Sequence, residues 1–243
     1  MNTKLLSCSL ATIAGALLAA GFLLLAAHQP AMAGMGSNPT VPTIRYVATT
    51  GNDGGGTSPC TSSAAPCRTV QQAVNVANSI DEIRVAAGVY SGVHAYAGES
   101  QVLHIIKTVA VQGGYTTADW STPDPTANPT VLDAQSLGRV VSISGDITPT
   151  LRGFVLTGGD ASGLTLNCES DAYGCGGGIF VYGAHPIIAH NIITDSVAAR
   201  STAYPRNTGY GGGIYLGSAP RSVIDDNLVV SNTASTAYCG AGG

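Results

Sequence analysis

The side chains that could carry out chemistry are few, and they lie in the second half of the sequence. Asp225 and Asp226 are adjacent acids, and a repeat alignment, given below, places His190 in the column of Asp226 and Arg152 in the column of Asp225. A calcium-dependent polysaccharide lyase needs such a basic group together with several carboxylates, because calcium takes about six to eight oxygen ligands. A glycoside hydrolase needs two carboxyl groups roughly 5 to 9.5 Å apart. These four residues are therefore the candidate catalytic set.

The alternative is that these acids are solvated turn residues at the ends of strands. On a strand, Asp225 and Asp226 point to opposite faces and do not share an ion. The best pair for a hydrolase is Asp195 with Asp226, but they fall at different positions of the repeat. The sequence therefore predicts no metal site and no cofactor, and calcium is expected only if the protein is a lyase. We expect three other histidines to be packed or exposed: His94, His104 and His185.

Aromatic side chains are candidates for sugar binding. Trp120 is the only tryptophan and lies in a Pro-rich insertion, TTADWSTPDPTANP. Tyr173, Tyr210 and Tyr215 recur around the glycine triplets of YGCGGGIFV and YGGGIYL. The alternative is that these aromatics shield strand ends, since isolated exposed hydrophobic residues are common on protein surfaces. The triplets themselves are not a phosphate-binding loop, because neither a lysine nor a helix follows them.

The elements that must position these residues are repeats. PTLRGFVLTGG, PIIAHNIITDS and RSVIDDNLVVSN align with Ser222 of the third copy in the place of Pro149 and Pro186, and these positions are 37 and then 36 residues apart. Repeats of this length are typical of solenoids, in which each copy buries its apolar face against its neighbours. Three apolar columns result: Leu151/Ile188/Ile224, Val155/Ile192/Leu228 and Leu156/Ile193/Val229.

The copies contain short strand-like runs and no amphipathic helix, which leaves a parallel β-helix whose coils stack about 4.8 Å apart. The alignment stacks Asp226 on His190 and Gly153, and it stacks Asp225 on Ala189 and Arg152. It predicts contact between His190 and Asp226 and a separation of roughly 10 Å between Arg152 and Asp225. Asn191 and Asn227 share a column, consistent with an amide ladder or with a repeated left-handed turn.

The glycine triplets Gly176–178 and Gly211–213 are predicted to be corners of successive coils. Only glycine takes a positive φ there without steric cost. The residues that follow restart a strand, with Ile179 and Ile214 pointing inward and Phe180 and Tyr215 pointing outward. The final YCGAGG is a third such corner without its strand restart, so we expect the sequence to stop within a coil and Cys239 to find its partner beyond Gly243.

One helix is predicted at about 69–79. Thr69 and Gln72 form a capping-box pattern, and the apolar stripe consists of Val70, Ala73, Val74 and Ala77. Such a short helix suits the capping of a solenoid end. The predicted organisation is a signal peptide over 1–33, an extended segment and loop over 34–67, and a capped β-helix over 68–243.

The amino terminus has the pattern of a secretory signal. Lys4 precedes an apolar run, and Ala31-Met32-Ala33 predicts cleavage between Ala33 and Gly34. The alternative is an uncleaved anchor, since about 20 apolar residues can cross a bilayer. We expect cleavage, no membrane span in the mature chain, and a secreted or cell-surface protein.

Charge and cysteines agree with export. The chain has 10 Lys and Arg against 14 Asp and Glu, and no basic cluster, which excludes nucleic acid as a partner. Two close cysteine pairs, Cys60 with Cys67 and Cys168 with Cys175, are most simply disulfides in an oxidising compartment. Zinc is the rival ligand, but the pair spacing is wider than in zinc knuckles and no histidine adjoins either pair.

Long parts of the sequence resemble a known family. GNDGGGTSPC, PCRTVQQAVNVAN and DEIRVAAGVYSG look like the opening of bacterial secreted β-helix proteins of the pectin-lyase-like superfamily, and LRGFVLTGG looks like a later coil. This resemblance implies a right-handed parallel β-helix. GGGI followed by VVSNTA is more loosely similar to the repeats of polymorphic outer-membrane adhesins.

The expected fold is therefore all-β, a right-handed parallel β-helix solenoid with one short N-terminal capping helix. Function does not follow from this fold, because β-helices serve as enzymes, adhesins and stalks. A clean repeat beside few converging acids and bases favours a non-catalytic binding, adhesion or structural module, with an extracellular polysaccharide or surface partner. The alternative is a polysaccharide lyase or glycoside hydrolase with part of its active site in coils outside this sequence.

Overall fold

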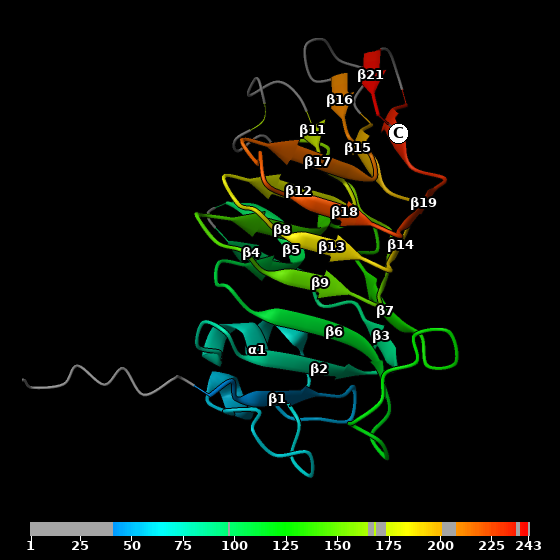
Figure 1. Ribbon diagram of the computed structural model, residues 1–243. Coiled ribbons are helices and arrows are strands. Elements are labelled where there is room, and N and C mark those ends of the chain that lie inside the picture. The colour runs from blue at the N-terminus through cyan, green and yellow to red at the C-terminus, as the bar shows by residue number, and fades with distance from the viewer. Residues whose placement is uncertain are drawn as a thin grey trace, which may run out of the picture. The chain divides into compact units, whose positions relative to one another are not determined.

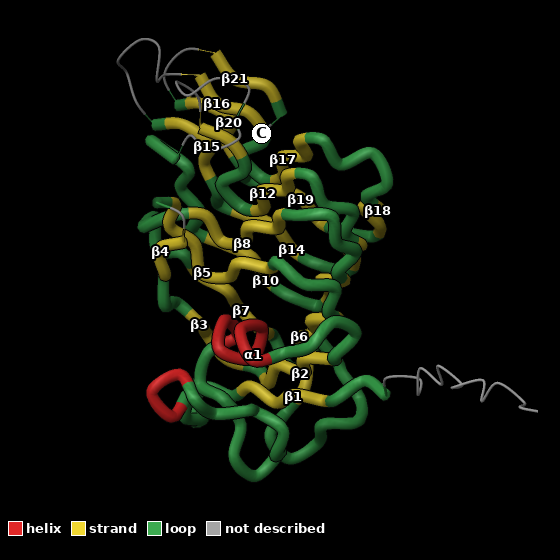
Figure 2. Tube along the Cα trace, turned by 90° about the vertical axis from the view of Figure 1, so that its left-hand side faces the viewer, coloured by secondary structure: helices red, strands yellow, loops and turns green. Residues whose placement is uncertain are grey.

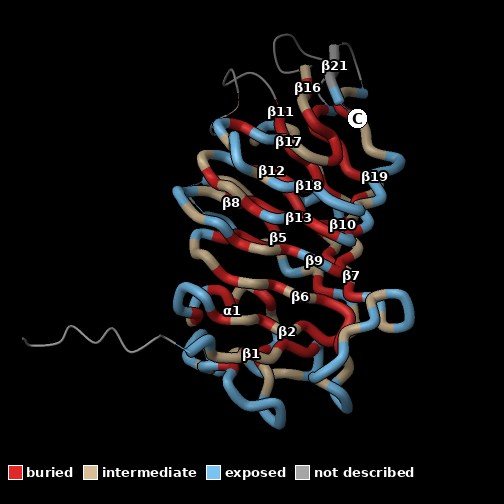
Figure 3. The backbone as a smooth tube through the Cα atoms, viewed as in Figure 1, coloured by how far each residue is buried: buried red, intermediate tan, exposed pale blue. Residues whose placement is uncertain are grey.

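A computed structural model describes residues 41–96, 98–164, 168, 174–200, 208–236 and 239–242 of the chain. These residues build a solenoid of short strands stacked in parallel sheets (Figure 1), with an interior that is buried through the inner coils (Figure 3). Within these described residues the expected all-β parallel solenoid with a single α-helix is confirmed, whereas its right-handedness stays a prediction. The predicted signal peptide, its cleavage point at Ala33 and Gly34, and the first residues of the 34–67 segment lie outside the described residues.

Three sheets form the faces of the coils, and each contains one strand from successive coils. All pairings between these strands are parallel except that of β4 with β5. The first sheet contains β1 (Ile44–Val47), β2 (Glu82–Ala86), β6 (Ala110–Tyr115), β9 (Thr150–Arg152), β13 (Ile187–Ala189) and β18 (Val223–Asp225). The second contains β3 (Gly88–Tyr90), β7 (Thr130–Asp133), β10 (Val155–Thr157), β14 (Ile192–Thr194) and β19 (Leu228–Val230). The third contains β4 (His94–Tyr96), β5 (Glu99–Ile105), β8 (Arg139–Ser144), β12 (Ile179–Tyr182) and β17 (Ile214–Gly217).

Smaller sheets and turns complete the later coils. They contain β11 (Gly174–Cys175), β16 (Thr208–Tyr210) and β21 (Cys239–Ala241), and β15 (Val197–Ala199) with β20 (Thr233–Ser235). Outside the sheets lie a 3₁₀ turn at Gly54–Gly56 and the helix α1 (Val70–Val76), red beside β1 and β2 in Figure 2.

The strand pairings of the structure have the register that the three predicted apolar columns require. Leu151 pairs with Ile188 and then Ile224, and Leu156 pairs with Ile193 and then Val229. Within these two columns, the residues of the inner coils are fully buried, whereas Ile224 and Val229 in the last described coil are 41% and 40% exposed. Burial in a column therefore depends on a coil on both sides. The third column, Val155/Ile192/Leu228, has the predicted register but faces outward.

The glycine triplets form corners, as predicted. Gly176 and Gly211 have φ values of +63° and +58°, and Ile179 pairs with Ile214 directly after them. The rings of Phe180 and Tyr215 stack at 5.6 Å. Phe180 is nevertheless buried, because the guanidinium of Arg139 lies 4.4 Å from the centre of its ring.

Arg139 also bonds to described residues beside the second disulfide. Its guanidinium donates hydrogen bonds to the carbonyls of Cys175 and Leu164, and it forms an ion pair with Glu99. Cys175 is bonded to Cys168, so this predicted disulfide is confirmed. The side chain of Cys239 lies outside the described residues.

Helix α1 caps the interior at the amino-terminal end. The Thr69 hydroxyl accepts a hydrogen bond from the Gln72 amide, and the predicted stripe of Val70, Ala73, Val74 and Ala77 is buried in the core. The helix ends at Val76, earlier than the predicted 79. The backbone is already extended at Ala77. The ammonium group of Lys107 caps the C-terminus of the helix by donating hydrogen bonds to the carbonyls of Val74, Asn75 and Ala77.

The amino-terminal edge of the first sheet is covered by the loop that the first disulfide closes. Cys60 and Cys67 are bonded, as predicted. The amide of Tyr46 in β1 donates to the carbonyl of Cys60, and the amide of Cys67 donates to the carbonyl of Tyr46. The loop therefore satisfies backbone groups that an open edge strand would leave unpaired.

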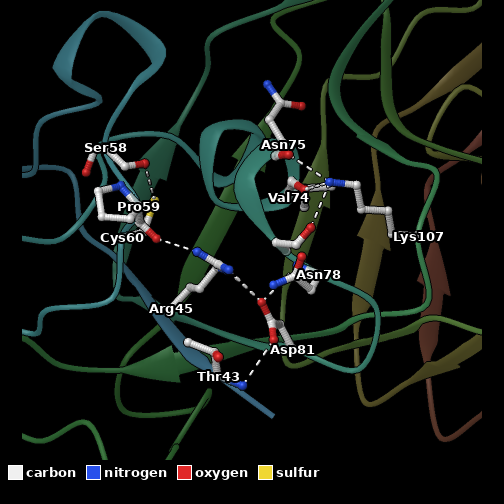
Figure 4. A network of polar contacts seen from close by, with 11 residues as sticks. Thr43, Arg45, Ser58, Pro59, Cys60, Val74, Asn75, Asn78, Asp81 and Lys107 are labelled. Atoms are coloured by element: carbon white, nitrogen blue, oxygen red, sulfur yellow. Dashed lines mark hydrogen bonds and ion pairs between the residues drawn. The ribbon is translucent and has the colours of Figure 1, made fainter. Parts of the chain in front are cut away.

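A buried ion pair lies under this cap (Figure 4). Arg45 occupies the inward column of Ile83 and Val111, and its guanidinium lies 2.7 Å from the Asp81 carboxylate. Asp81 also accepts hydrogen bonds from the amides of Thr43 and Asn78. Burial by itself would raise the pKa of Asp81, but these amides and Arg45 together lower it below the ordinary 3.8.

We expect Asp81→Asn to lower the free energy of unfolding by about 3 kcal/mol at pH 7, because Arg45 is left buried without a counter-charge. The folded-state pKa of Asp81 lies below the unfolded value, so this stabilisation is present above about pH 4 and disappears as the pH falls through the folded pKa. Urea unfolding at pH 7 and at pH 3 should therefore show a smaller difference between wild type and variant at pH 3. Asp146→Asn is the control, since that side chain is 92% exposed, and its effect should stay within about 0.5 kcal/mol.

Candidate functional site

The polar residues at the corner between the first and second sheets form a vertical series. Gly153, His190 and Asp226 stand at the same position of successive coils, with φ values of +74°, +55° and +47°. The His190 Nδ1 atom lies 2.8 Å from a carboxylate oxygen of Asp226, so the alignment placed this contact correctly. Both side chains are exposed, by 54% and 77%, and they project from the ridge of the corner.

An asparagine ladder fixes this corner. The Asn191 side chain accepts a hydrogen bond from the Phe154 amide at 3.0 Å and donates to the carbonyl of Leu151, and it is 1% exposed. Asn227 repeats the pattern one coil later by accepting from the Asn191 amide. Of the two alternatives left by the sequence, the structure has the amide ladder at Asn191 and Asn227, while the left-handed turn belongs to the residue before each of them.

A second ladder at the next corner was missed by sequence reasoning. The Gly159 amide donates to the Ser196 hydroxyl, and the Ser196 amide donates to the Asn232 side chain. Asp195 precedes Ser196 with a φ of +52°. The signal was available, because Ser196 and Asn232 each lie five positions after Asn191 and Asn227.

A groove of about 420 Å³ runs beside the His190 and Asp226 ridge, and we call it the corner groove. One wall is the 116–129 loop, through Pro125, Thr126 and Pro129. The other wall crosses three coils and is mainly apolar, with the two polar side chains at its edge. It is formed by Gly153, Phe154, Val155, His190, Asn191, Ile192, Asp226 and Leu228.

The corner groove exists because the loop covers only one coil of the ridge. A Cβ atom at Gly153 would lie 2.9 Å from a ring carbon of Pro125, so the loop occupies the space of a side chain there. In the next two coils, His190 and Asp226 carry full side chains at the equivalent positions. The ridge position is therefore a glycine where the loop covers it and a polar side chain in the next two coils, which lie beside the loop.

Trp120 holds this loop against the first sheet. Its ring packs edge to face on Tyr46, with centroids 5.1 Å apart, and lies 6.3 Å from the ring of Tyr115. Arg84 donates a hydrogen bond to its carbonyl. Burial, with a smaller effect of the nearby Glu82 carboxylate, raises the pKa of Tyr115 to about 12. These contacts match the structural alternative for Trp120, and the side chain does not line the corner groove.

The other sequence candidates are dispersed. Arg152 and Asp225 share an outward column of the first sheet but are separated by Ala189, so they do not pair. Tyr215 stacks on Phe180, and the backbone of Tyr210 pairs with Cys175. Tyr173 lies outside the described residues. Over the described ranges, three or more His, Cys, Asp or Glu side chains nowhere gather as a metal site would require.

The remaining histidines are partly structural. His104 is buried, burial lowers its pKa, and its Nε2 lies 3.0 Å from the Ser144 hydroxyl. His185 is mostly buried, and its Nδ1 has no partner among the described residues. His94 is exposed beside α1.

One family model matches residues 49–238, and its description is a protein of unknown function (DUF1565). The chain belongs to this family. No curated protein and no solved structure matches it. The DUF1565 match includes α1, both disulfides and the corner groove, so all three belong to the family domain. Within the described parts of this DUF1565 chain, no helix has the length and apolar character to cross a bilayer.

We expect His190→Gly to change the free energy of unfolding by no more than about 1 kcal/mol. Glycine accepts the φ of +55° and the lost ion pair is exposed. His190→Val should lower the free energy of unfolding by about 1–2 kcal/mol, because a β-branched side chain opposes a left-handed backbone. Denaturant unfolding of the two variants is the measurement. Equal stability of the two variants would contradict the left-handed conformation of this corner.

Proposed function

We propose that the protein is an exported binding module that holds a neutral polysaccharide strand in the corner groove. The observation that carries the proposal is an apolar groove of about 420 Å³ with a hydrogen-bonding pair at its edge. Ligand sites are commonly concave, mainly apolar and supplied with a few polar groups that set orientation. A polysaccharide strand is complementary to both parts of this groove. Its C–H faces would pack on Ile192 and Leu228, and its hydroxyl groups would hydrogen-bond to His190 and Asp226.

The backbone of the polar pair supports a binding role. His190 and Asp226 hold left-handed conformations that glycine adopts in the preceding coil at Gly153. Non-glycine residues in this region cost free energy, and such outliers concentrate at functional sites. Polar side chains at the two exposed positions beside the groove are thus the ones expected to contact a ligand.

Charge favours a neutral ligand over an acidic one. Among the residues that line the corner groove, Asp226 carries a charge and none is Lys or Arg. The chain as a whole has a net charge of −4. A uronic-acid polymer would meet a carboxylate at the groove and an acidic protein around it, so its affinity should be lower than that of a neutral polymer.

Export and family relations complete the proposal. The signal-like amino terminus and two disulfides fit a secreted or cell-surface protein, since disulfides persist in oxidising compartments. The resemblance to pectin-lyase-like β-helices and to adhesin repeats is in keeping with polysaccharide binding outside the cell. We infer that the mature chain begins at Gly34.

A polysaccharide lyase is the second candidate function. A general base would use Nε2 of His190, because Nδ1 contacts Asp226. The described residues bring no second carboxylate into the lining of the groove, which disfavours a two-carboxylate hydrolase.

Binding should depend on the polar pair and not on the equivalent acid at the next corner. We expect His190→Gly and Asp226→Asn each to weaken binding of neutral oligosaccharides by about tenfold, the loss of one good hydrogen bond. Asp195→Asn is the matched control, because Asp195 is also exposed and left-handed but does not line the groove. Its affinity should stay within about twofold of wild type.

The measurement is isothermal titration of cellohexaose, xylohexaose and mannohexaose, chosen after a glycan array, with hexagalacturonate as the acidic comparator. The same mixtures are assayed for unsaturated and reducing sugar ends. Equal losses in Asp195→Asn and Asp226→Asn would reject the corner groove as the site. Turnover that His190→Gly abolishes would replace the binding module with the lyase.

A further inference from the structure

A second cleft lies at the amino-terminal end, between α1 and the β4–β5 hairpin. It has two halves of about 330 and 260 Å³, and both are lined by Thr69 and His94, so they meet at these residues. We call it the helix cleft. It shares no lining residue with the corner groove. The hairpin that forms one wall is the one antiparallel pairing between strands of the described solenoid.

The floor of the helix cleft is built from polar side chains held in place, of which Gln71 is half-buried and Gln101 is buried. Gln71 receives a hydrogen bond from the His104 amide at 2.7 Å and donates to the His104 carbonyl and to Asn75. Gln101 is 2% exposed and donates to the carbonyl of His94. Fixed amides of this kind present donors and acceptors without a large entropic cost of ordering on binding.

An aromatic platform stands above this floor. The Tyr96 ring is 50% exposed and rests against the ring of His104, with centroids 4.1 Å apart. Among the described residues, the protein provides no hydrogen-bond partner for the Tyr96 hydroxyl, the Asn75 side-chain NH₂ or the His94 ring. Three polar groups and one ring face are therefore available to a ligand in the half lined by α1.

The charges of the helix cleft nearly cancel. Arg68 and Asp53 line opposite halves. The Asp53 carboxylate already accepts hydrogen bonds from the amides of Arg68 and Thr69 and from the Thr69 hydroxyl. A ligand in the amide-rich half thus meets one carboxylate, Asp53, whose oxygens already accept these three hydrogen bonds, together with neutral amides beside an aromatic face.

We propose that the helix cleft is a second carbohydrate site, which takes a neutral oligosaccharide with one sugar ring stacked on Tyr96. The ring of a neutral sugar has an apolar C–H face for the tyrosine and a rim of hydroxyl groups for Asn75 and His94. This site is independent of the corner groove, so the chain binds two oligosaccharides at two separate places.

The test is titration of the full chain with cellohexaose, xylohexaose and mannohexaose, followed by calorimetry and by NMR of the side-chain amides. Tyr96→Ala should weaken binding at the helix cleft by at least about tenfold, whereas Tyr96→Phe, which keeps the ring, should stay within about threefold. Tyr182→Ala is the matched control, because Tyr182 is an exposed tyrosine of the same sheet that does not line the cleft. It should bind as wild type does.

Combined variants separate this site from the corner groove. His190→Gly should weaken one of the two binding events about tenfold and leave the other, which shifts the side-chain amides of Gln71 and Asn75, at its wild-type affinity; adding Tyr96→Ala should weaken that one about tenfold as well. Binding that survives in Tyr96→Ala with unchanged shifts at Gln71 and Asn75 would overturn the helix-cleft proposal and leave the corner groove intact. Failure of all three neutral hexaoses to shift these amides, or equal binding of hexagalacturonate there, would overturn it as well.

Discussion

Stacking of each coil on its own copy is the constraint on which the rest of the structure depends. Strands in successive coils pair in parallel at a fixed separation, so every position of one coil meets the same position of the next. Leu151 lies on Ile188, Asn191 lies on Asn227, and His190 lies beside Asp226 because of this one translation. Apolar columns then bury a continuous core, and polar columns bond along their length. The exposure of Ile224 and Val229 in the last described coil shows how directly burial depends on a neighbour on each side.

The amino-terminal end cannot use this rule, so a different set of contacts closes it. The loop of Cys60 and Cys67 supplies backbone partners to β1, and α1 covers the interior. Arg45 stands in an inward column where other coils have Ile83 and Val111, and Asp81 compensates its charge. At this end of the solenoid, a disulfide, a helix and a buried ion pair replace the contacts that a preceding coil would make.

Both candidate sites lie where the chain departs from the coil. The 116–129 loop makes a wall of the corner groove, and the excursion before β5 makes a wall of the helix cleft. A perfectly regular solenoid has flat faces, whereas an insertion beside a coil creates a concave surface with edges. The scaffold therefore supplies rigid columns such as the asparagine ladder, and the insertions supply the shape in which a ligand would lie.

From the sequence alone, the repeat predicts the parallel solenoid, the register of its columns and the glycine corners, and local motifs predict the capping residue Thr69 and both disulfides. The solenoid, its register and its corners follow from a repeat, because stacked copies meet by one translation and the alignment contains that translation. The helix predicted from the sequence is longer at its C-terminal end than α1, because the Lys107 side chain that caps this end comes from a distant segment of the chain. The sequence also did not distinguish an amide ladder from a left-handed turn at Asn191 and Asn227. Both features occur at this corner, and the residues that carry them are neighbours in the chain.

The positions of the cavities, by contrast, depend on how distant segments pack in the folded chain. The packing of Trp120 on Tyr46, of Pro125 over Gly153 and of Tyr96 on His104 brings together segments with no repeat relation. Such contacts depend on shape and on the path of insertions, which no period in the sequence encodes.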